Sequence, residues 1–405
     1  MVNGTGVIAA ENHRLTARNL PVAPQPRALF VNHSSVISGA ELILLDTVIP
    51  WAGASAFLFE AGPLQPALAD RGLHTIMARW GAGLSGVRRD SNLLAALPLA
   101  GRLLGVAAEL ASVARGFDVL YANSQKAFVL AAFAARWARV PLIWHLHDII
   151  DDAHFGAAQR RLQIGLANNW TWRVIVPSQA AASAFVAAGG HADRVQIVVN
   201  GLDISPDPPS PSRAALGLPE GKLFGVFSRL APWKGQHVAL DALAQIPDAS
   251  CVIVGSALFH EDAYEARLRA QAAQPGLAGR VHFLGQRSDV GALMQAVDVM
   301  VHPSVDPEPF GRTLVEAMRV GTPVIASDSG AAAEILDGGN SGTLVPPGDA
   351  AALAAALRRV LDRPDHGQCA RAEARARAVY GVAAMQAALG DVIRQSVIFQ
   401  SARPA

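Results

Sequence analysis

Cysteine is nearly absent from this sequence, since Cys251 and Cys369 are the only two in 405 residues. Two cysteines cannot build the disulfide framework of a small secreted domain, so a reducing compartment is expected. Long apolar runs are missing too, because no window reaches the roughly 20 apolar residues of a membrane-spanning helix. Residues 1–30 lack the basic start and apolar stretch of a secretory signal. We therefore expect a cytoplasmic protein, and peripheral contact with the inner face of the membrane stays open.

An excess of charge of one sign is also lacking, with 34 Lys plus Arg against 33 Asp plus Glu. A net charge of +1 gives no general basic field, so no nucleic acid partner is predicted. Lysine itself is scarce, occurring only as Lys126, Lys222 and Lys234. Because lysine supplies a compact point charge that arginine does not, a lysine kept in an arginine-rich chain is a functional candidate.

What the chain has in quantity is apolar residues, at 51% against 17% charged, which indicates a globular protein with a large core. Its length exceeds what one core usually supports, so two domains are expected. The proline-rich segment 203–212 cannot form a helix or a strand and marks the boundary. The predicted parts are a loose leader (1–26), a first domain (27–202), a linker (203–212), a second domain (213–380), and a C-terminal helix and tail (381–405). Packing of this last helix on the first domain stays open.

Short β-branched runs alternate with helical segments in both halves, which predicts βαβ units and parallel sheets. No sequence repeat links the halves. Cys251 falls inside one of these runs and is expected in the core. The predicted strands are 27–32, 56–59, 118–123, 141–148, 172–178 and 195–201, then 223–228, 249–255, 281–285, 297–301 and 323–327.

The most informative stretch is 297–318, where an apolar strand leads into a proline-rich loop and then a helix starting near Gly311. Free N–H groups at such a helix start favour anions, through both unsatisfied amides and the helix dipole. Glu308 precedes this helix and Glu316 lies inside it, where carboxylates would accept hydrogen bonds from hydroxyls. Amides that bind phosphate, together with carboxylates that bind hydroxyls, favour a nucleotide-sugar pocket. The alternative is that the two glutamates are solvated on the surface.

Arg229 and Lys234 follow the first strand of the second domain, five residues apart across Pro232. An arginine fork and a lysine point charge that converge suit a diphosphate, although a solvated basic pair is the alternative. In the first domain, His145, His147 and Asp148 end a strand. Neither histidine has metal ligands at a familiar spacing, so no zinc site is predicted. We interpret His145 as a core residue and His147 as the functional candidate.

Together these motifs resemble the retaining GT-B glycosyltransferases, specifically glycosyltransferase family 4, from about residue 27 to 385. The matching residues are Ser38-Gly39-Ala40-Glu41, His147-Asp148, Asn200-Gly201-Leu202-Asp203, Arg229 with Lys234-Gly235, Glu308 with Glu316, and 321–327. Ser38 departs from the family, which commonly has glycine there. The resemblance implies an α/β fold in which two Rossmann-like, doubly wound domains face each other across a cleft.

The resemblance also implies roles for individual residues. Arg229 and Lys234 would clamp the diphosphate, Glu316 would bind the ribose, and Arg287 would lie near the base. Glu308, beside the donor sugar, and His147, near the anomeric carbon, would be the catalytic pair, with Asp148 on the acceptor side. The other residues implied at the donor site are Ser38, Gly39, Phe310, Gly311, Arg312, Thr313 and Leu314.

The expected reaction moves a sugar, with retention and without a divalent metal or other cofactor, from a UDP- or GDP-sugar to a saccharide or lipid-linked acceptor. Cell-surface polysaccharide or glycoconjugate assembly would be its setting. The alternatives are a nucleotide-sugar epimerase of the same fold and a non-catalytic nucleotide-sugar-binding protein. One segment has two interpretations. It forms either a surface that binds anionic lipid or a buried helix that carries solvated arginines. The residues concerned are Arg79, Trp80, Arg88, Arg89, Arg102 and the leucines of 93–104.

Overall fold

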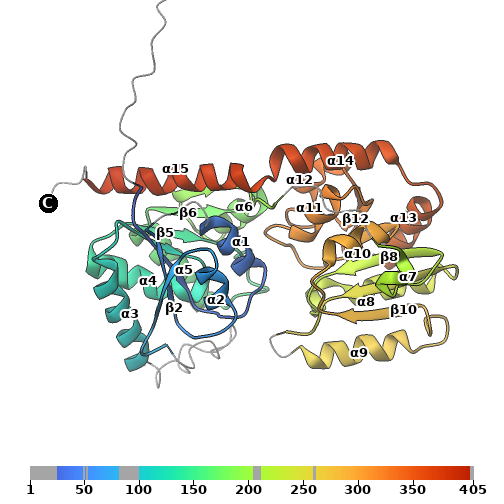
Figure 1. Cartoon of the computed structure of the whole chain (residues 1–405), viewed down its shortest axis with the longest axis horizontal. Helices are drawn as coiled ribbons and strands as arrows, with labels where there is room; N and C mark the ends of the chain where they lie inside the picture. The colour runs from blue at the N-terminus through green and yellow to red at the C-terminus, as the bar shows by residue number, and fades with distance from the viewer. Residues whose placement is uncertain are drawn as a thin grey trace, which may run out of the picture.

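The computed structural model of the chain describes residues 25–48, 51, 53–81, 100–203, 211–258 and 261–401, with side chains up to residue 399. They form two lobes that lie side by side, each a parallel sheet flanked by helices (Figure 1). The prediction of two Rossmann-like α/β domains is confirmed. The expectations for most of the leader, for 204–210 of the linker, and for Arg88, Arg89 and the leucines of 93–99 lie outside the described residues.

The N-terminal sheet has seven strands in the order β3-β2-β1-β4-β5-β6-β7, and every neighbouring pair is parallel. All five residues of β1 are buried, as expected for a strand covered by helices on both faces. The strands are β1 (Ala28–Asn32), β2 (Ser55–Leu58), β3 (His74–Met77), β4 (Val119–Ala122), β5 (Leu142–His145), β6 (Arg173–Val176) and β7 (Val195–Ile197). The helices are α1 (Gly39–Val48), α2 (Leu64–Ala69), α3 (Ala100–Ala114), α4 (Gln125–Ala138), α5 (Ala157–Trp170) and α6 (Gln179–Ala187).

The C-terminal sheet has six parallel strands in the order β10-β9-β8-β11-β12-β13. Cys251 is fully buried in β9, as predicted. The strands are β8 (Lys222–Phe227), β9 (Ala249–Val254), β10 (Val281–Gly285), β11 (Val299–His302), β12 (Val324–Ser327) and β13 (Thr343–Val345). The helices are α7 (Arg213–Leu216), α8 (Gln236–Ala244), α9 (Asp262–Ala272), α10 (Val290–Ala296), α11 (Arg312–Arg319), α12 (Ala332–Ile335), α13 (Ala350–Asp362) and α14 (His366–Val379).

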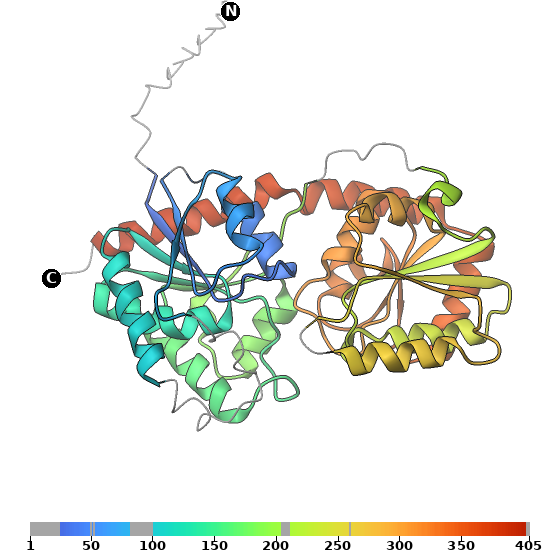
Figure 2. The same cartoon turned by 60° about the horizontal axis from the view of Figure 1, so that its bottom comes forward.

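The last helix, α15 (Val382–Ser401), leaves the C-terminal lobe and lies along the N-terminal one (Figures 1 and 2). Its residues Met385, Leu389, Val392 and Ile393 join the core formed by α1 and one face of the N-terminal sheet. The chain therefore crosses between the lobes twice. The two crossings lie side by side, because Leu202 N–H donates to Tyr380 O at 2.8 Å and Val382 N–H donates to Leu202 O at 2.9 Å.

The elements that were not predicted from the sequence include β3, β13 and α5. The edge strand β3 is partly exposed, so it lacks the continuous apolar run that reveals a buried parallel strand. Helix α5 is slightly hydrophilic on average, and only four of its residues are buried: Gln163, Ile164, Leu166 and Ala167. The leucine- and alanine-rich composition of 91–115 predicts a long helix; the structure has α3 from Ala100 to Ala114, and 91–99 lie outside the described residues.

Candidate functional site

Glu308 lies in the loop after β11 and is only 8% exposed, so it is not the solvated surface carboxylate of the alternative interpretation. His302, the last residue of β11, places Nε2 2.8 Å from Glu308 Oε1. The buried hydroxyl of Ser304 donates to the same oxygen. On the other side, Lys234 Nζ donates to Glu308 Oε2 at 2.6 Å. The carboxylate is therefore enclosed by two basic groups and a hydroxyl.

Lys234 reaches Glu308 because two loops of the C-terminal domain touch. The tight turn Pro232–Lys234 ends at Gly235, which has φ +70°. A Cβ on Gly235 would lie 1.9 Å from the carbonyl oxygen of Pro303, so only glycine permits this approach. Val305 N–H also donates to Trp233 O at 2.9 Å. The indole of Trp233 lies beneath both predicted clamp residues, 4.3 Å from Lys234 Nζ and 4.9 Å from Arg229 Cζ.

The pKa values of Glu308 and Lys234 follow from this environment. Burial would raise the pKa of Glu308, but Lys234 and His302 outweigh it and hold that pKa well below its ordinary value. Burial also lowers the pKa of Lys234, against the opposing effect of Glu308 and with a further lowering from Arg229. The influence of Arg229 on Lys234 is consistent with two cations gathered at one place.

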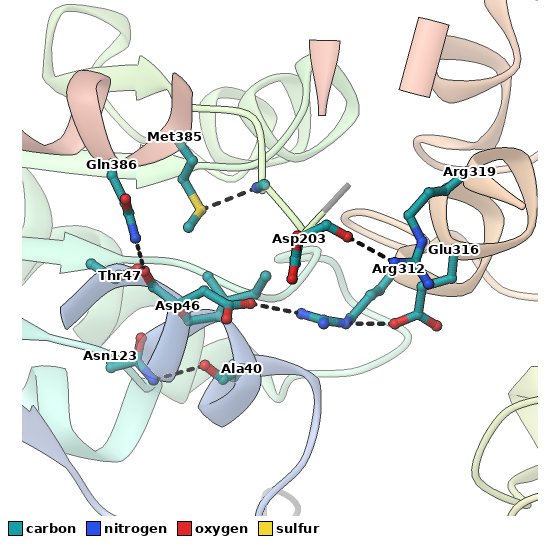
Figure 3. Close-up of polar contacts among 12 residues, drawn as sticks. Ala40, Asp46, Thr47, Asn123, Asp203, Arg312, Glu316, Arg319, Met385 and Gln386 are labelled. Carbon is teal, nitrogen blue, oxygen red and sulfur yellow. Dashed lines mark hydrogen bonds and ion pairs between the residues drawn. The ribbon is translucent and has the colours of Figure 1, made fainter. Parts of the chain in front are cut away.

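Helix α11 begins at Arg312, directly after Gly311, as the sequence predicts. Arg312 Nε donates to Glu316 Oε1 at 2.8 Å, and its guanidinium also reaches Asp46 Oδ2 of α1 in the other domain at 3.2 Å (Figure 3). Arg312 and Glu316 line a cavity of about 170 Å³ together with Leu202, Asp203, Val290, Gly291 and Arg319. The predicted ribose ligand thus borders a cavity where the two domains join.

In the first domain, His147 Nε2 lies 3.0 Å from Asn123 Oδ1. Burial lowers the pKa of His147 to about 4, although the charge of Asp148 opposes the shift. His145 is buried and its Nδ1 is 2.7 Å from the hydroxyl of Tyr121, which agrees with the core role expected of it. Asp148 accepts a hydrogen bond from Gln125 Nε2 at 2.9 Å.

The remaining predicted residues have diverse surroundings. Arg287 forms a two-point ion pair with Asp289, at 2.8 and 2.6 Å. Phe310 is buried beside Tyr380, with ring centroids 5.9 Å apart. Thr313 Oγ1 lies 3.3 Å from His302 Nδ1, and Leu314 is fully buried.

Ser38 donates to Glu41 Oε2 from its hydroxyl at 2.6 Å and from its amide at 3.2 Å, while Gly39 has open space where a Cβ would lie.

Several residues of the site were not singled out from the sequence. His302 and Ser304 complete the surroundings of Glu308, and Asn123 holds His147. A signal was available, because His302 ends β11 and Asn123 directly follows β4, and ligand sites of parallel sheets lie at the carboxyl ends of strands. Asp46 had no such signal, since only the relative placement of the domains brings it to Arg312.

Among the described residues, no group of three or more His, Cys, Asp and Glu side chains is arranged to hold a metal ion. Within the same ranges, no helix is long and apolar enough to cross a membrane.

The protein is thus a two-domain, Rossmann-like α/β protein with basic and acidic side chains gathered after β8 and β11 of its C-terminal domain. Residues 211–379 match the profile described as "Glycosyl transferases group 1", and residues 66–206 match "Glycosyltransferase Family 4". The chain belongs to this family of glycosyltransferases, as its motifs indicated.

Similar proteins agree with this assignment. The HepE protein of Anabaena, solved in complex with UDP-glucose, is 35% identical with a TM-score of 0.82, covering 91% of this chain and 100% of that one. A phosphatidyl-myo-inositol mannosyltransferase of Mycobacterium leprae is 35% identical over 60% of this chain. A lipopolysaccharide core biosynthesis mannosyltransferase of Rhizobium meliloti is 31% identical over 41% of this chain. The matches span 64% and 50% of these two curated relatives.

Proposed function

We propose that the protein transfers a sugar, with retention of configuration, from a UDP-sugar to a saccharide or lipid-linked acceptor. The observation that carries the proposal is the buried cluster of Lys234, Glu308 and His302 where the loops after β8 and β11 meet. UDP is preferred to GDP as the nucleotide because the similar HepE protein was solved with UDP-glucose.

The proposed chemistry is stabilisation of the leaving group. When the bond between the anomeric carbon and the diphosphate oxygen breaks, its electron pair leaves with UDP and negative charge grows on the diphosphate. Arg229, Lys234 and the amides from Gly311 to Thr313 at the start of α11 would face that charge, already oriented before the reaction. Glu308 and His147 would lie beside the sugar, where positive charge develops.

We also propose that no divalent metal takes part, because the two cations supply the charge that a metal would otherwise bring to the diphosphate. Turnover should then persist in excess EDTA. Loss of turnover in EDTA, restored by Mn²⁺ or Mg²⁺, would overturn this part of the proposal.

The decisive experiment is a panel of UDP-, GDP- and ADP-sugars, scored by thermal stabilisation and by release of the nucleoside diphosphate. We expect one or more UDP-sugars to stabilise the protein and to be slowly hydrolysed without acceptor. Conversion of a nucleotide sugar to its epimer would favour the epimerase instead. Binding without release, in the presence of saccharide and lipid-linked acceptors, would favour the non-catalytic binding protein.

The proposed setting is assembly of cell-surface polysaccharide or glycoconjugate, in the cytoplasm and peripherally at the inner face of the membrane. It is supported by the names of the mannosyltransferases of Mycobacterium leprae and Rhizobium meliloti, which refer to a phospholipid and to lipopolysaccharide. Cell fractionation tests it, since recovery of all of the protein away from the membrane fraction would remove the peripheral association.

A further inference from the structure

A chain of hydrogen bonds runs from Glu41 in α1, through Asn32 at the end of β1 and Asn123 directly after β4, to His147 after β5. Glu41, Asn32 and Asn123 are 3%, 1% and 0% exposed, so water does not compete for their polar atoms. Asn32 Nδ2 donates to Glu41 Oε1 at 3.1 Å, and Asn123 Nδ2 is 3.3 Å from Asn32 Oδ1. Asn123 Oδ1 lies 3.0 Å from His147 Nε2.

The direction of every bond in this chain is fixed, beginning at Asn32. Its Nδ2 faces two groups that only accept, the carbonyl of Ser34 at 2.8 Å and the carboxylate of Glu41. The opposite amide orientation would point an oxygen at both. Glu41 is itself held in place, because its other oxygen accepts from the amide and hydroxyl of Ser38. Asn32 Oδ1 is therefore left as an acceptor facing Asn123.

The same argument fixes Asn123. Its Nδ2 lies 3.3 Å from Asn32 Oδ1 and 3.2 Å from the carbonyl of Ala40, both acceptors (Figure 3 shows the contact with Ala40). Its Oδ1 must then face His147, and an amide oxygen can only accept. His147 Nε2 therefore has to carry a proton.

We propose that Asn123, held by Asn32 and Glu41, is a positioning residue that fixes His147 as the neutral tautomer protonated on Nε2. His147 Nδ1 is then a hydrogen-bond acceptor, suited to a hydroxyl of the donor sugar. This role in orienting a sugar rests on the proposed function, whereas the tautomer does not.

The charged and titratable groups around His147 are consistent with a neutral ring. The ring of His145 lies against it, with centroids 3.9 Å apart and the ring planes tilted by 40°, and burial holds the pKa of His145 well below its ordinary value. Tyr121 bonds to His145, and burial raises the pKa of that phenol well above 10. Asp148 favours the charged ring, but burial prevails and lowers the pKa of His147 to about 4.

The tautomer is measured directly by nitrogen-15 NMR of histidine-labelled wild-type protein, with the His147 signals assigned from a His147→Asn variant. At pH 7 we expect one neutral form, protonated on Nε2. A proton on Nδ1, or a mixture of both tautomers, would overturn the proposal. This measurement needs no substrate and no folded variant of Asn123.

Asn123→Asp supplies a second readout, because it places a carboxylate beside Nε2 and removes the donor to Asn32 and Ala40. We expect the pKa of His147 to rise by about one unit or more. The matched control is Ser124→Ala, which removes the hydroxyl that caps α4 at 3.3 Å without touching the chain of amides. A pKa of His147 unchanged in Asn123→Asp, or shifted equally in the control, would contradict the proposal.

Kinetics connect the tautomer to the reaction. Asn123→Ala should lower kcat for UDP-sugar turnover by about tenfold or more, since misplacing a reacting group costs that much or more. Its Kd for UDP should stay near the wild-type value, because His147 is assigned to the sugar. Equal effects on kcat and on UDP binding would assign Asn123 a merely structural role. If no nucleotide sugar is turned over while NMR finds the Nε2 form, the proposed function fails and the fixed tautomer stands.

Discussion

At the scale of single residues, Glu308 stabilises the fold in a way that depends on pH. A carboxyl whose pKa is lowered on folding stabilises the native state above its unfolded pKa, and that stabilisation is lost as pH falls. Because the pKa of Glu308 lies well below the ordinary 4.5, its contribution is complete at neutral pH. Glu308→Gln also leaves Lys234 buried without its partner. We expect the free energy of unfolding to fall by about 3–5 kcal/mol at pH 7.

The loss should shrink progressively as pH falls below about 4.5, because the Glu308 carboxyl then takes up a proton in the unfolded state while it stays ionised in the native state, which lowers the stability of the wild type. Chemical denaturation of both proteins at pH 7 and at steps below 4.5 measures this. A difference that stays constant across the range would show that the charge of Glu308 is not the cause.

The two glutamates should differ in kinetics. Glu316 would bind ribose hydroxyls equally in the ground and transition states, so Glu316→Gln should raise KM more than it lowers kcat. Glu308 would act as the glycosidic bond breaks, so Glu308→Gln should lower kcat and change the UDP Kd little. Both variants are compared at a temperature where each is folded. The opposite pattern would exchange the two roles, and no effect in either would remove both from the site.

The predicted clamp can be tested against another lysine of the same chain. Arg229→Ala and Lys234→Ala should each weaken UDP binding by about 1.5–3 kcal/mol, the range for charged hydrogen bonds. Lys222→Ala is the control, since Lys222 pairs on the surface with Asp248 at 2.5 Å and Asp362 at 2.7 Å. Calorimetry should find the UDP affinity of Lys222→Ala unchanged. Lys234→Ala also unpairs Glu308, so Arg229→Ala is the cleaner variant. Unchanged affinity in folded Arg229→Ala would remove Arg229 from the clamp.

At the scale of elements, the contact between the loops after β8 and β11 depends on one glycine. Gly235→Ala would set a Cβ against the Pro303 carbonyl and strain a positive φ, so we expect lower stability and weaker UDP binding. Gly217→Ala is the matched control, because Gly217 has φ +72° and nothing within 4 Å of its Cβ position. It should cost about 1–2 kcal/mol, the left-handed strain alone, and keep UDP affinity. Equal behaviour of the two variants would show that the loop contact does not matter.

The sequence predicts well the elements whose surroundings it encodes locally. β11 is an apolar run, and Gly311 followed by an unbroken segment predicts α11, so the positions of Glu308 and Glu316 relative to their elements follow from the chain alone. The approach of Lys234 to Glu308 does not, because it joins residues 74 apart through a turn that touches the Pro303 carbonyl. Edge strand β3 was missed since half-exposed strands lack a strong apolar signal.

At the scale of the whole molecule, the candidate site residues lie in both domains, and the domains are joined by two adjacent crossings, at Leu202 and at Gly381. Opening and closing would bend the chain there, and the polar contacts that bridge the domains would favour the closed form. Arg312 reaches Asp46 at 3.2 Å, and Glu334 accepts from the amides of Gln179 and Ala180 at 2.8 and 2.7 Å, at the start of α6. The Glu334 carboxylate also lies where the dipole of α6 favours negative charge.

These contacts are partly exposed, so each should contribute up to about 1 kcal/mol to closure. The double variant Asp46→Asn, Glu334→Gln is therefore expected to shift the population towards open forms by several-fold to about thirtyfold, since 1.4 kcal/mol corresponds to a factor of ten. Small-angle scattering should give a larger radius of gyration than wild type without ligand. High salt should have the same effect on wild type, because it screens exposed pairs. Asp248→Asn, which removes an ion pair within one domain, should scatter like wild type. If the double variant has the wild-type radius of gyration at every salt concentration, the contacts of Asp46 and Glu334 do not hold the domains together.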